Sequence, residues 1–255
     1  MKRRQDGSCE ETVTIGFSEA DAFGRCKACR CKASTLLRMF GDLADADYAA
    51  RGLAHERLAS EGYVFLLSRM RLELLRGIHS GETLTLRTAE RGAEGPFCDR
   101  GYLAFDAAER PVALGRAFWL LCDPMTRRIH KPDSFPYAFS SRQDFAAACQ
   151  KPGRIRIPGS MQPVGERRIV YSDLDGNGHT NNAVYADIAF DVLPLALPQQ
   201  GLRDLQLQYV REAKYGETLS LYTHTESGTA YVEGRIGDET CFTAALRFFD
   251  DTSAS

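Results

Sequence analysis

The feature that most constrains this chain is a short segment that occurs twice. Residues 80–86 read Ser-Gly-Glu-Thr-Leu-Thr-Leu, and residues 215–221, which begin 135 positions further on, read Tyr-Gly-Glu-Thr-Leu-Ser-Leu. An alternating segment precedes each copy, over 69–75 and 203–209, and two further strand-like segments follow each. Because the surroundings repeat together with the motif, we predict a duplicated fold.

The first half is predicted to contain one long helix followed by strands. The spacing of apolar residues over 35–50 places one stripe on a helix face, made of Leu36, Leu37, Phe40, Leu43, Ala44 and Tyr48. Four segments rich in β-branched, aromatic and alternating residues then follow, over 63–75, 82–90, 99–106 and 111–122. Turn-forming glycines and prolines separate them, which predicts a four-stranded antiparallel meander.

The second half repeats this order. We predict a strand over 166–171, a helix over 181–193, and strands over 203–211, 217–225, 229–236 and 240–249. Each half is thus predicted as β-α-β-β-β-β. The stretch between them, 132–165, holds five of the ten prolines and is typical of a linker. We therefore expect an N-terminal domain over 10–131 and a C-terminal domain over 166–250.

A long helix on a curved antiparallel sheet, present twice in one chain, is the organisation of a tandem (double) hot-dog protein of the α+β class. An antiparallel sheet needs one face covered, and one central helix can cover it. The 255 residues, 44% of them hydrophobic, are sufficient for such a core. Two sheets of this kind can join edge to edge.

Composition excludes several classes of protein. The net charge of −2 is unlike that of a dedicated nucleic-acid binder, which is usually strongly basic. No apolar run reaches the ~18 residues that cross a bilayer, and none at the start is long enough for a signal peptide. Eight cysteines are too few for a disulfide scaffold of this length. We expect a cytoplasmic protein with reduced thiols.

The densest polar cluster lies over 172–182, between a predicted strand and the second helix. Its residues Asp175, Asn177 and His179 alternate, a spacing that can direct three side chains to one side of an extended loop. The start of the cluster imitates an EF-hand loop, but Val184 occupies the position of the twelfth ligand, which argues against calcium. A polar turn that caps the helix through Thr180 or Asn181 is the other interpretation. We favour a functional site.

The pattern S-D-L-D-x-N-x-H-x-N-N before an apolar helix resembles the signature of the acyl-acyl carrier protein (acyl-ACP) thioesterases of plants and bacteria. The resemblance extends over roughly residues 10 to 250 and includes Trp119, Thr126-Arg127-Arg128 and Tyr209-Val210-Arg211-Glu212. It implies a double hot-dog enzyme that hydrolyses fatty acyl-ACP without a cofactor or metal. Carried over position by position, it implies a catalytic set of Asp175, Asn177, His179 and Glu212.

One position departs from the family. The cysteine that often follows the catalytic glutamate is Ala213 here, so this position cannot attack a thioester. The remaining groups suit attack by water, with Glu212 as the base. Asn177 and His179 could orient the water or stabilise the oxyanion, Asp175 could hold their geometry, and backbone N–H groups at the helix start could assist.

The duplication predicts a division of labour. Gly77 stands at the repeat position of Glu212, and the loop over 22–32 contains neither Asn nor His. The first half is therefore expected to bind the acyl chain, along the apolar faces of helix 35–50 and strand 63–75. The second half is expected to catalyse.

Weaker signals leave alternatives open. Cys26, Cys29 and Cys31 resemble half of a zinc site, but no second CxxC completes it. The linker region is basic through Arg127, Arg128, Lys131, Arg142, Lys151, Arg154 and Arg156, either as a solvated connector or as a surface for the acidic carrier protein and its phosphopantetheine. An acyl-CoA thioesterase and a non-catalytic acyl-binding protein are the competing functions, and the oligomeric state stays open, a homodimer included.

Overall fold

The N-terminal half is built around one long helix and a sheet. The computed structural model describes residues 1–21, 30–139 and 141–249. Helix α1, Ala33–Ala50, buries its apolar stripe, including Leu36, Phe40 and Leu43, and is followed by the short α2, His55–Ser60. The predicted helix is therefore confirmed, and it begins two residues earlier than expected. Gly52 at φ +73° turns the chain after it.

The strands of this half follow a different order from the predicted meander. They are β1 (Lys2–Arg3), β2 (Cys9–Thr14), β5 (Val64–Leu74), β6 (Thr83–Glu94), β7 (Phe97–Phe105) and β8 (Pro111–Cys122), with a separate small pair of β3 (Ala20–Asp21) and β4 (Arg30–Cys31). Short turns join β6, β7 and β8 as neighbours, but β5 pairs with β8, and β2 pairs with β6. The connection between β5 and β6 is too long for a tight hairpin, so β5 crosses to the other side.

The C-terminal half repeats this arrangement. Its elements are β9 (Gln162–Arg168), α3 (Val184–Asp191), α4 (Ala196–Gln200), β10 (Leu202–Tyr209), β11 (Thr218–Glu226), β12 (Thr229–Ile236) and β13 (Glu239–Phe248). The order β10-β13-β12-β11-β9 corresponds to β5-β8-β7-β6-β2. The strand predicted over 166–171 corresponds to β9, which begins four residues earlier and ends three residues earlier. The predicted helix over 181–193 is shorter at both ends, because Asn181 caps its start and Pro194 follows its end.

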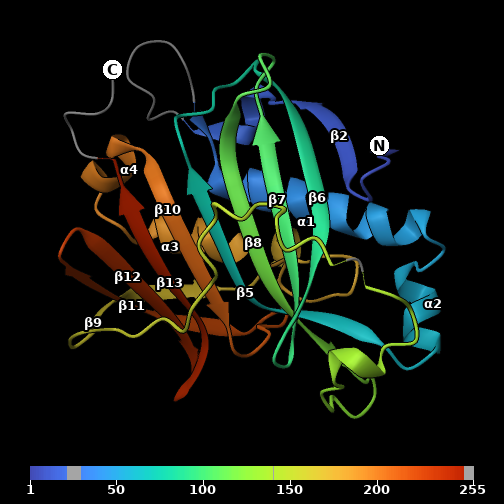
Figure 1. Cartoon of the computed structure of the whole chain (residues 1–255). Helices are drawn as coiled ribbons and strands as arrows, with labels where there is room; N and C mark the ends of the chain where they lie inside the picture. The colour runs from blue at the N-terminus through green and yellow to red at the C-terminus, as the bar shows by residue number, and fades with distance from the viewer. Residues whose placement is uncertain (22–29, 140, 250–255) are drawn as a thin grey trace.

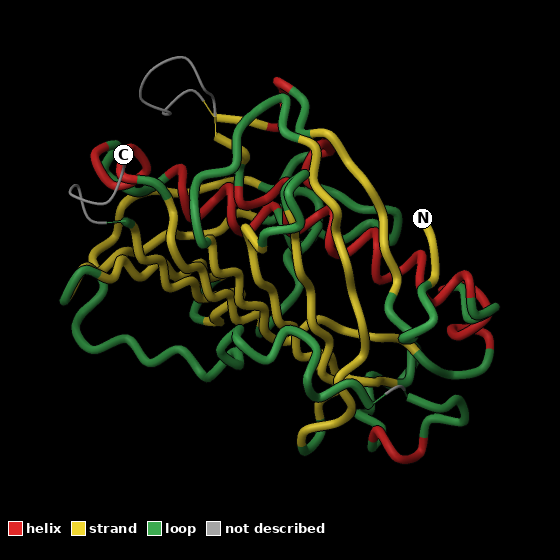
Figure 2. The backbone as a smooth tube through the Cα atoms, turned by 45° about the horizontal axis from the view of Figure 1, so that its top comes forward, coloured by secondary structure: helices red, strands yellow, loops and turns green. Residues whose placement is uncertain are grey.

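The two halves form one continuous sheet of eleven strands. Strands β5 and β10 pair antiparallel, with Leu205 opposite Leu72 and Leu207 opposite Met70. Helices α1 and α3 lie on one face of the sheet and the linker crosses the other (Figure 1), and the strands of the two halves follow one another in a single layer (Figure 2). The fold is the predicted tandem hot-dog.

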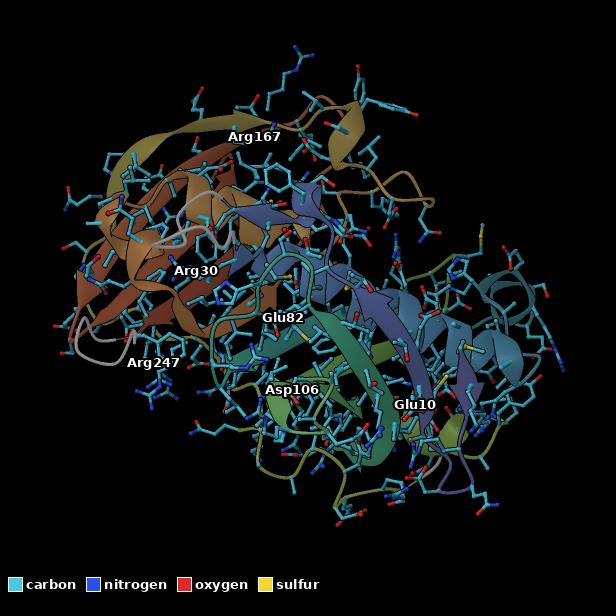
Figure 3. The ribbon with its side chains drawn as sticks, turned by 90° about the horizontal axis from the view of Figure 1, so that it is seen from above. Glu10, Arg30, Glu82, Asp106, Arg167 and Arg247 are labelled. Carbon is cyan, nitrogen blue, oxygen red and sulfur yellow. The ribbon has the colours of Figure 1, made fainter. Side chains whose placement is uncertain are left out.

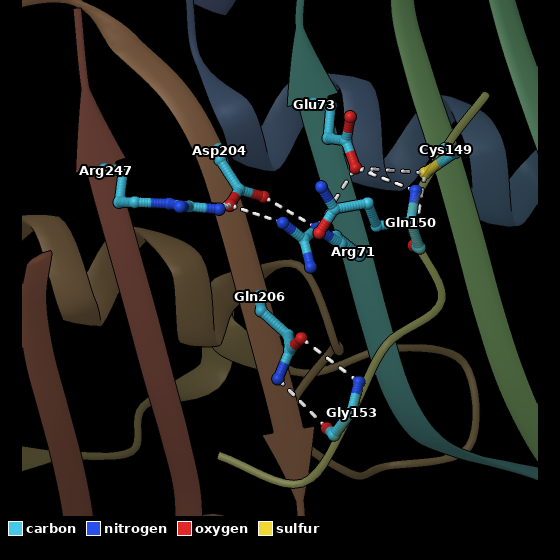
Figure 4. A network of polar contacts seen from close by, with 8 residues as sticks. All are labelled: Arg71, Glu73, Cys149, Gln150, Gly153, Asp204, Gln206 and Arg247. Carbon is cyan, nitrogen blue, oxygen red and sulfur yellow. Dashed lines mark hydrogen bonds and ion pairs between the residues drawn. The ribbon is translucent and has the colours of Figure 1, made fainter. Parts of the chain in front are cut away.

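A polar network holds the join together (Figure 4). Arg71 of β5 donates to both carboxylate oxygens of Asp204 on β10, at 3.0 and 2.8 Å, and Arg247 of β13 contacts the same carboxylate. The linker attaches beside it, because the Gln150 N–H donates to Glu73 of β5 and Gly153 exchanges two hydrogen bonds with Gln206 of β10. Segments from both halves and the linker are thus fixed at one place.

The corner that connects β5 or β10 to the next strand has the same hydrogen bonds in both halves. The Cys31 N–H donates to the Ile78 carbonyl at 2.8 Å, and the Thr180 N–H donates to the Ala213 carbonyl at 3.2 Å. Matching bridges join Arg30 to His79 and His179 to Lys214. The repeat seen in the sequence is therefore a structural one, and it places Arg30 where the other half has His179.

Candidate active site

The polar loop before α3 is a tight turn rather than an extended segment. Leu174 and Thr180 form a β-bridge across it, and the Asp175 N–H donates to the His179 carbonyl at 2.8 Å. The Asp175 carboxylate accepts the backbone N–H groups of Asn177 and His179 at 2.9 and 3.2 Å. Asp175 therefore holds the shape of the turn, while the Asn177 side chain is exposed at its tip.

Glu212 lies in the loop after β10, which ends at Tyr209, two residues before the end of the predicted strand over 203–211. This loop is clamped to the turn. The Ala213 carbonyl accepts both the N–H and the hydroxyl of Thr180, at 3.2 and 2.7 Å, and the Ala213 N–H donates to the buried Tyr185 hydroxyl of α3 at 3.0 Å. The clamp fixes the backbone on either side of the site.

This clamp brings His179 and Glu212 together. The His179 Nε2 atom lies 3.6 Å from Glu212 Oε2, and the two side chains are 30% and 37% exposed. Both side chains are therefore accessible to water, while the backbone beneath them is held by the hydrogen bonds among Thr180, Ala213 and Tyr185. Of the four residues expected in the site, the structure brings the side chains of His179 and Glu212 together, and Asp175 supports the turn through its carboxylate. The exposed Asn177 side chain is not in contact with this pair.

Sequence reasoning missed one residue of this site. Arg127, in the turn after β8 of the first half, donates to Glu212 Oε2 at 3.1 Å. The sequence assigned it to the basic linker region, although the Thr-Arg-Arg segment that contains it was part of the family resemblance. The first half therefore contributes a charged group to a site that was expected to lie in the second half alone.

The start of α3 offers few free donors for an oxyanion. The N–H groups of Thr180 and Asn181 donate to the carbonyls of Ala213 and Asp173, and those of Ala183 and Val184 donate to Asn181. Since these groups are already bonded inside the protein, the expected contribution of the helix start is small.

A cavity of about 380 Å³ lies in the first half, between the end of α1, α2 and the sheet. Its wall is mainly apolar and includes Ala46, Leu53, Phe65 and Trp119. The cavity is lined by the last residues of α1 and the first of β5, whereas the earlier part of the apolar stripe belongs to the central core.

Asp45 of α1 also lines this cavity, and desolvation by burial raises the pKa of its carboxyl.

A second cavity, of about 830 Å³, lies at the opposite end of the join. It is lined by Arg30, Gly77 and His79, and it therefore lies at the position in the first half that corresponds to the His179–Glu212 site. Figure 3 shows the molecule from this end, with Arg30 labelled. The Arg30 guanidinium donates to the carbonyls of Pro198 and Gln199. Gly77 brings no carboxylate to this corner, which agrees with the asymmetry read from the sequence.

The cysteine cluster gives no sign of a metal site within the described part of the chain. Cys26 and Cys29 lie outside it, and burial raises the pKa of the Cys31 thiol to about 12. The described residues contain no group of three or more potential metal ligands. Across these same ranges, no helix combines the length and apolar character needed to span a membrane.

Two hot-dog units that share one sheet, with a histidine and a glutamate facing water at the corner of the second unit, are the arrangement of a double hot-dog thioesterase. Family models agree. The acyl-ACP thioesterase N-terminal domain matches residues 8–134, and the C-terminal domain of the same family matches residues 163–240. The chain belongs to the acyl-ACP thioesterase family, so it is a thioester hydrolase of fatty acyl-ACP, as the resemblance implied.

Solved structures show the same fold over nearly the whole chain. An acyl-ACP thioesterase from Bacteroides thetaiotaomicron VPI-5482 is 23% identical, with 97% of this chain and 100% of that chain covered and a TM-score of 0.78. A putative oleoyl thioesterase from Lactobacillus plantarum is 21% identical (96% and 96% covered, TM-score 0.79). The 12:0-ACP thioesterase from Umbellularia californica is 15% identical (94% and 96%, TM-score 0.75). The comparison with curated proteins finds no match.

Proposed function

We propose that the chain hydrolyses acyl-ACP by direct attack of water, activated by Glu212. The observation that carries this proposal is the approach of His179 to Glu212 at 3.6 Å in an exposed site with a clamped backbone. Water attacks the thioester carbonyl carbon as Glu212 takes its proton. The C–S bond then breaks, the phosphopantetheine sulfur leaves and takes a proton, and the free fatty acid and holo carrier protein are released.

The neighbouring residues divide the remaining tasks. His179 and Asn177 supply side-chain donors for the water or for the oxyanion, which is the charge that develops on the thioester oxygen. Asp175 keeps the turn in shape through its two backbone hydrogen bonds. Ala213 is buried and carries no nucleophile, so a covalent acyl-enzyme at this position is not part of the mechanism.

The N-terminal domain, over 10–131, binds the acyl chain in this proposal, and the C-terminal domain, over 166–250, supplies the base. Support comes from the apolar cavity of about 380 Å³ beside α1. A methylene group is about as large as a water molecule, which takes roughly 30 Å³ in the liquid, so the cavity holds on the order of a dozen chain atoms. We therefore propose a substrate of medium chain length.

The carrier protein is proposed to dock on exposed basic side chains near the site. Several cations of the linker region are already paired, such as Lys151 with Glu94 and Arg142 with Asp144. Within the described ranges, no ion pair occupies Arg128, Lys131, Arg154 or Arg156, which remain available for an acidic partner. We also propose that the reaction takes place in the cytoplasm, as expected from the sequence.

Replacement of the two central residues tests the mechanism. We expect Glu212→Ala and His179→Ala each to lower kcat on acyl-ACP by ~100-fold or more, the scale of a lost general base or oxyanion donor. Circular dichroism should show a retained fold. Glu226→Ala, an exposed glutamate at the end of β11, is the matched control and should keep its rate. Near-normal rates for both site variants would rule out this site.

A second measurement separates the carrier protein from coenzyme A. Rates on acyl-ACP and acyl-CoA of the same chain length should favour the carrier protein, because only that substrate can use the basic surface. A clear preference for acyl-CoA would reverse the assignment of the partner. Binding of either substrate without release of thiol would instead indicate a non-catalytic protein.

A further inference from the structure

We propose that Arg127 is a positioning residue that aligns Glu212 across the boundary between the two halves. This inference rests on the proposed role of Glu212 as the base. It assigns to the N-terminal half a direct part in the reaction, beyond holding the acyl chain. Arg127 contacts Glu212 and not the substrate, so it acts through that carboxylate.

The turn that carries Arg127 is well defined by its own hydrogen bonds. The Asp123 carboxylate accepts the N–H groups of Met125 and Thr126 at 3.0 and 2.7 Å and the Thr126 hydroxyl at 2.9 Å. The Asp123 backbone also pairs with Arg127 and Arg128. The turn therefore projects from the end of β8 in one fixed shape.

Arg127 itself has an unusual backbone conformation. Its φ angle is +59°, in the left-handed region that residues with a Cβ atom rarely adopt. Such a conformation persists only where the surrounding structure imposes it, and it is common at functional sites. Here the turn imposes it, and the Arg127 side chain bonds the Glu212 carboxylate of the other half.

The contacts at Glu212 leave its two oxygens unequal. Arg127 donates to Oε2 at 3.1 Å, and His179 Nε2 lies 3.6 Å from the same oxygen. Among the described residues, none is bonded to Oε1. One oxygen is thus anchored, and the other is left to accept a proton from water. Loss of the anchor would let the carboxylate rotate away from the attack position.

Other charged and titratable groups around Glu212 do not replace this anchor. Tyr185 of α3 feels the charge of Glu212, but its hydroxyl is bonded to the Ala213 N–H. Arg211, next to Glu212 in the same loop, pairs with Glu217 at 2.7 Å. Lys214 is exposed two residues further along the loop and forms no ion pair with Glu212, so Arg127 is the cation bonded to this carboxylate among the described residues.

The test compares Arg127→Gln and Arg127→Lys on acyl-ACP and on a carrier-free acyl-pantetheine. We expect Arg127→Gln to lower kcat about tenfold or more on both substrates, with KM within threefold of the wild type. Arg127→Lys, which keeps a cation at this position, should restore part of the lost kcat on both substrates.

Two controls keep this result separate from the proposed function. Arg203→Gln, at an exposed position of β10, removes the same charge elsewhere and should leave both substrates unaffected. The double variant of Arg127→Gln with Glu212→Ala should lose no more activity than Glu212→Ala alone, because Arg127 acts only through that carboxylate.

Each opposite outcome overturns the proposal. A loss confined to acyl-ACP would make Arg127 a carrier-protein contact, and a loss that Arg127→Lys does not restore at all would make its role structural. A further loss in the double variant would show that it acts without Glu212. Normal activity of Glu212→Ala would contradict the proposed mechanism itself. Normal activity of Arg127→Gln, with an inactive Glu212→Ala, would contradict only the role of Arg127.

Discussion

Tyr185 shows how a single buried hydroxyl can control an exposed site. It is 3% exposed, and burial raises its pKa to about 12, so the phenol stays neutral at any working pH. Its oxygen accepts the Ala213 N–H at 3.0 Å, one residue after Glu212. The backbone next to Glu212, the proposed base, is therefore held by a hydrogen bond to a buried side chain.

Replacement of this tyrosine should affect stability and turnover together. Tyr185→Phe leaves the buried Ala213 N–H without a partner, which costs about 1–3 kcal/mol of unfolding free energy. We expect kcat to fall severalfold because the Glu212 loop loses its support. Urea unfolding and steady-state kinetics measure the two effects. Tyr222→Phe in β11 is the control, and equal behaviour of the two variants would argue against this role.

At the scale of residues, the sequence could indicate the site but not its contacts. Asp175 and His179 belong to a local pattern, so their grouping is visible in the chain. Glu212 could be identified only through the family resemblance. Arg127 could not be assigned, because its contact with Glu212 depends on a turn conformation and on the way β5 and β10 join.

At the scale of elements, the join between β5 and β10 is the most demanding contact. It buries the ion pair between Arg71 and Asp204, and each of these residues is only 8% exposed to solvent. A buried ion pair of this kind contributes little relative to apolar residues, but the loss of one partner leaves an uncompensated charge. The join is therefore more sensitive to a missing charge than to a replaced pair.

We expect Asp204→Ala to lower the unfolding free energy by about 3 kcal/mol, the lower end of the range for a broken buried pair. Arg71 keeps one contact, with Glu73 at 3.1 Å, which limits the loss. Chemical unfolding measures the effect. Gln206→Ala, on the same strand but bonded only to the linker, should cost less than half as much. A loss below 1 kcal/mol for Asp204→Ala would contradict this account.

Most elements could be predicted from periodicity, but their neighbours could not. The helix over 35–50 and the strands of both halves follow from apolar spacing. The order of the strands depends on long-range pairing, which a window of sequence does not contain. The meander was wrong for this reason, since β5 found β8 and β10 as partners rather than β6.

At the scale of the whole molecule, the apolar cavity and the proposed catalytic residues belong to different halves. The cavity of about 380 Å³ is lined by α1, α2 and the first sheet, whereas His179 and Glu212 come from the second half. Chain-length preference and chemistry should therefore respond to different substitutions. The sequence could suggest this separation through Gly77, but not the depth of the cavity.

A larger side chain in the cavity should shift the preferred substrate. Ala46→Phe fills part of the space, and we expect a preference for shorter acyl chains, with each rejected methylene worth roughly 1–3 kcal/mol in kcat/KM. A chain-length series of acyl-ACP substrates measures it. Ala59→Phe, on α2 but outside the cavity wall, is the control. Equal loss at every chain length would mean that the cavity does not hold the acyl chain.

The two outer strands of the sheet have a consequence for solubility. An exposed strand edge is a template for another chain and invites aggregation. At one end β1 is only Lys2–Arg3, and at the other β9 is mostly exposed, contains Pro163 and ends in Glu166, Arg167 and Arg168. Proline removes a donor, and charged side chains along an edge disfavour pairing with another strand. Both ends of this sheet are therefore poor templates for a further strand.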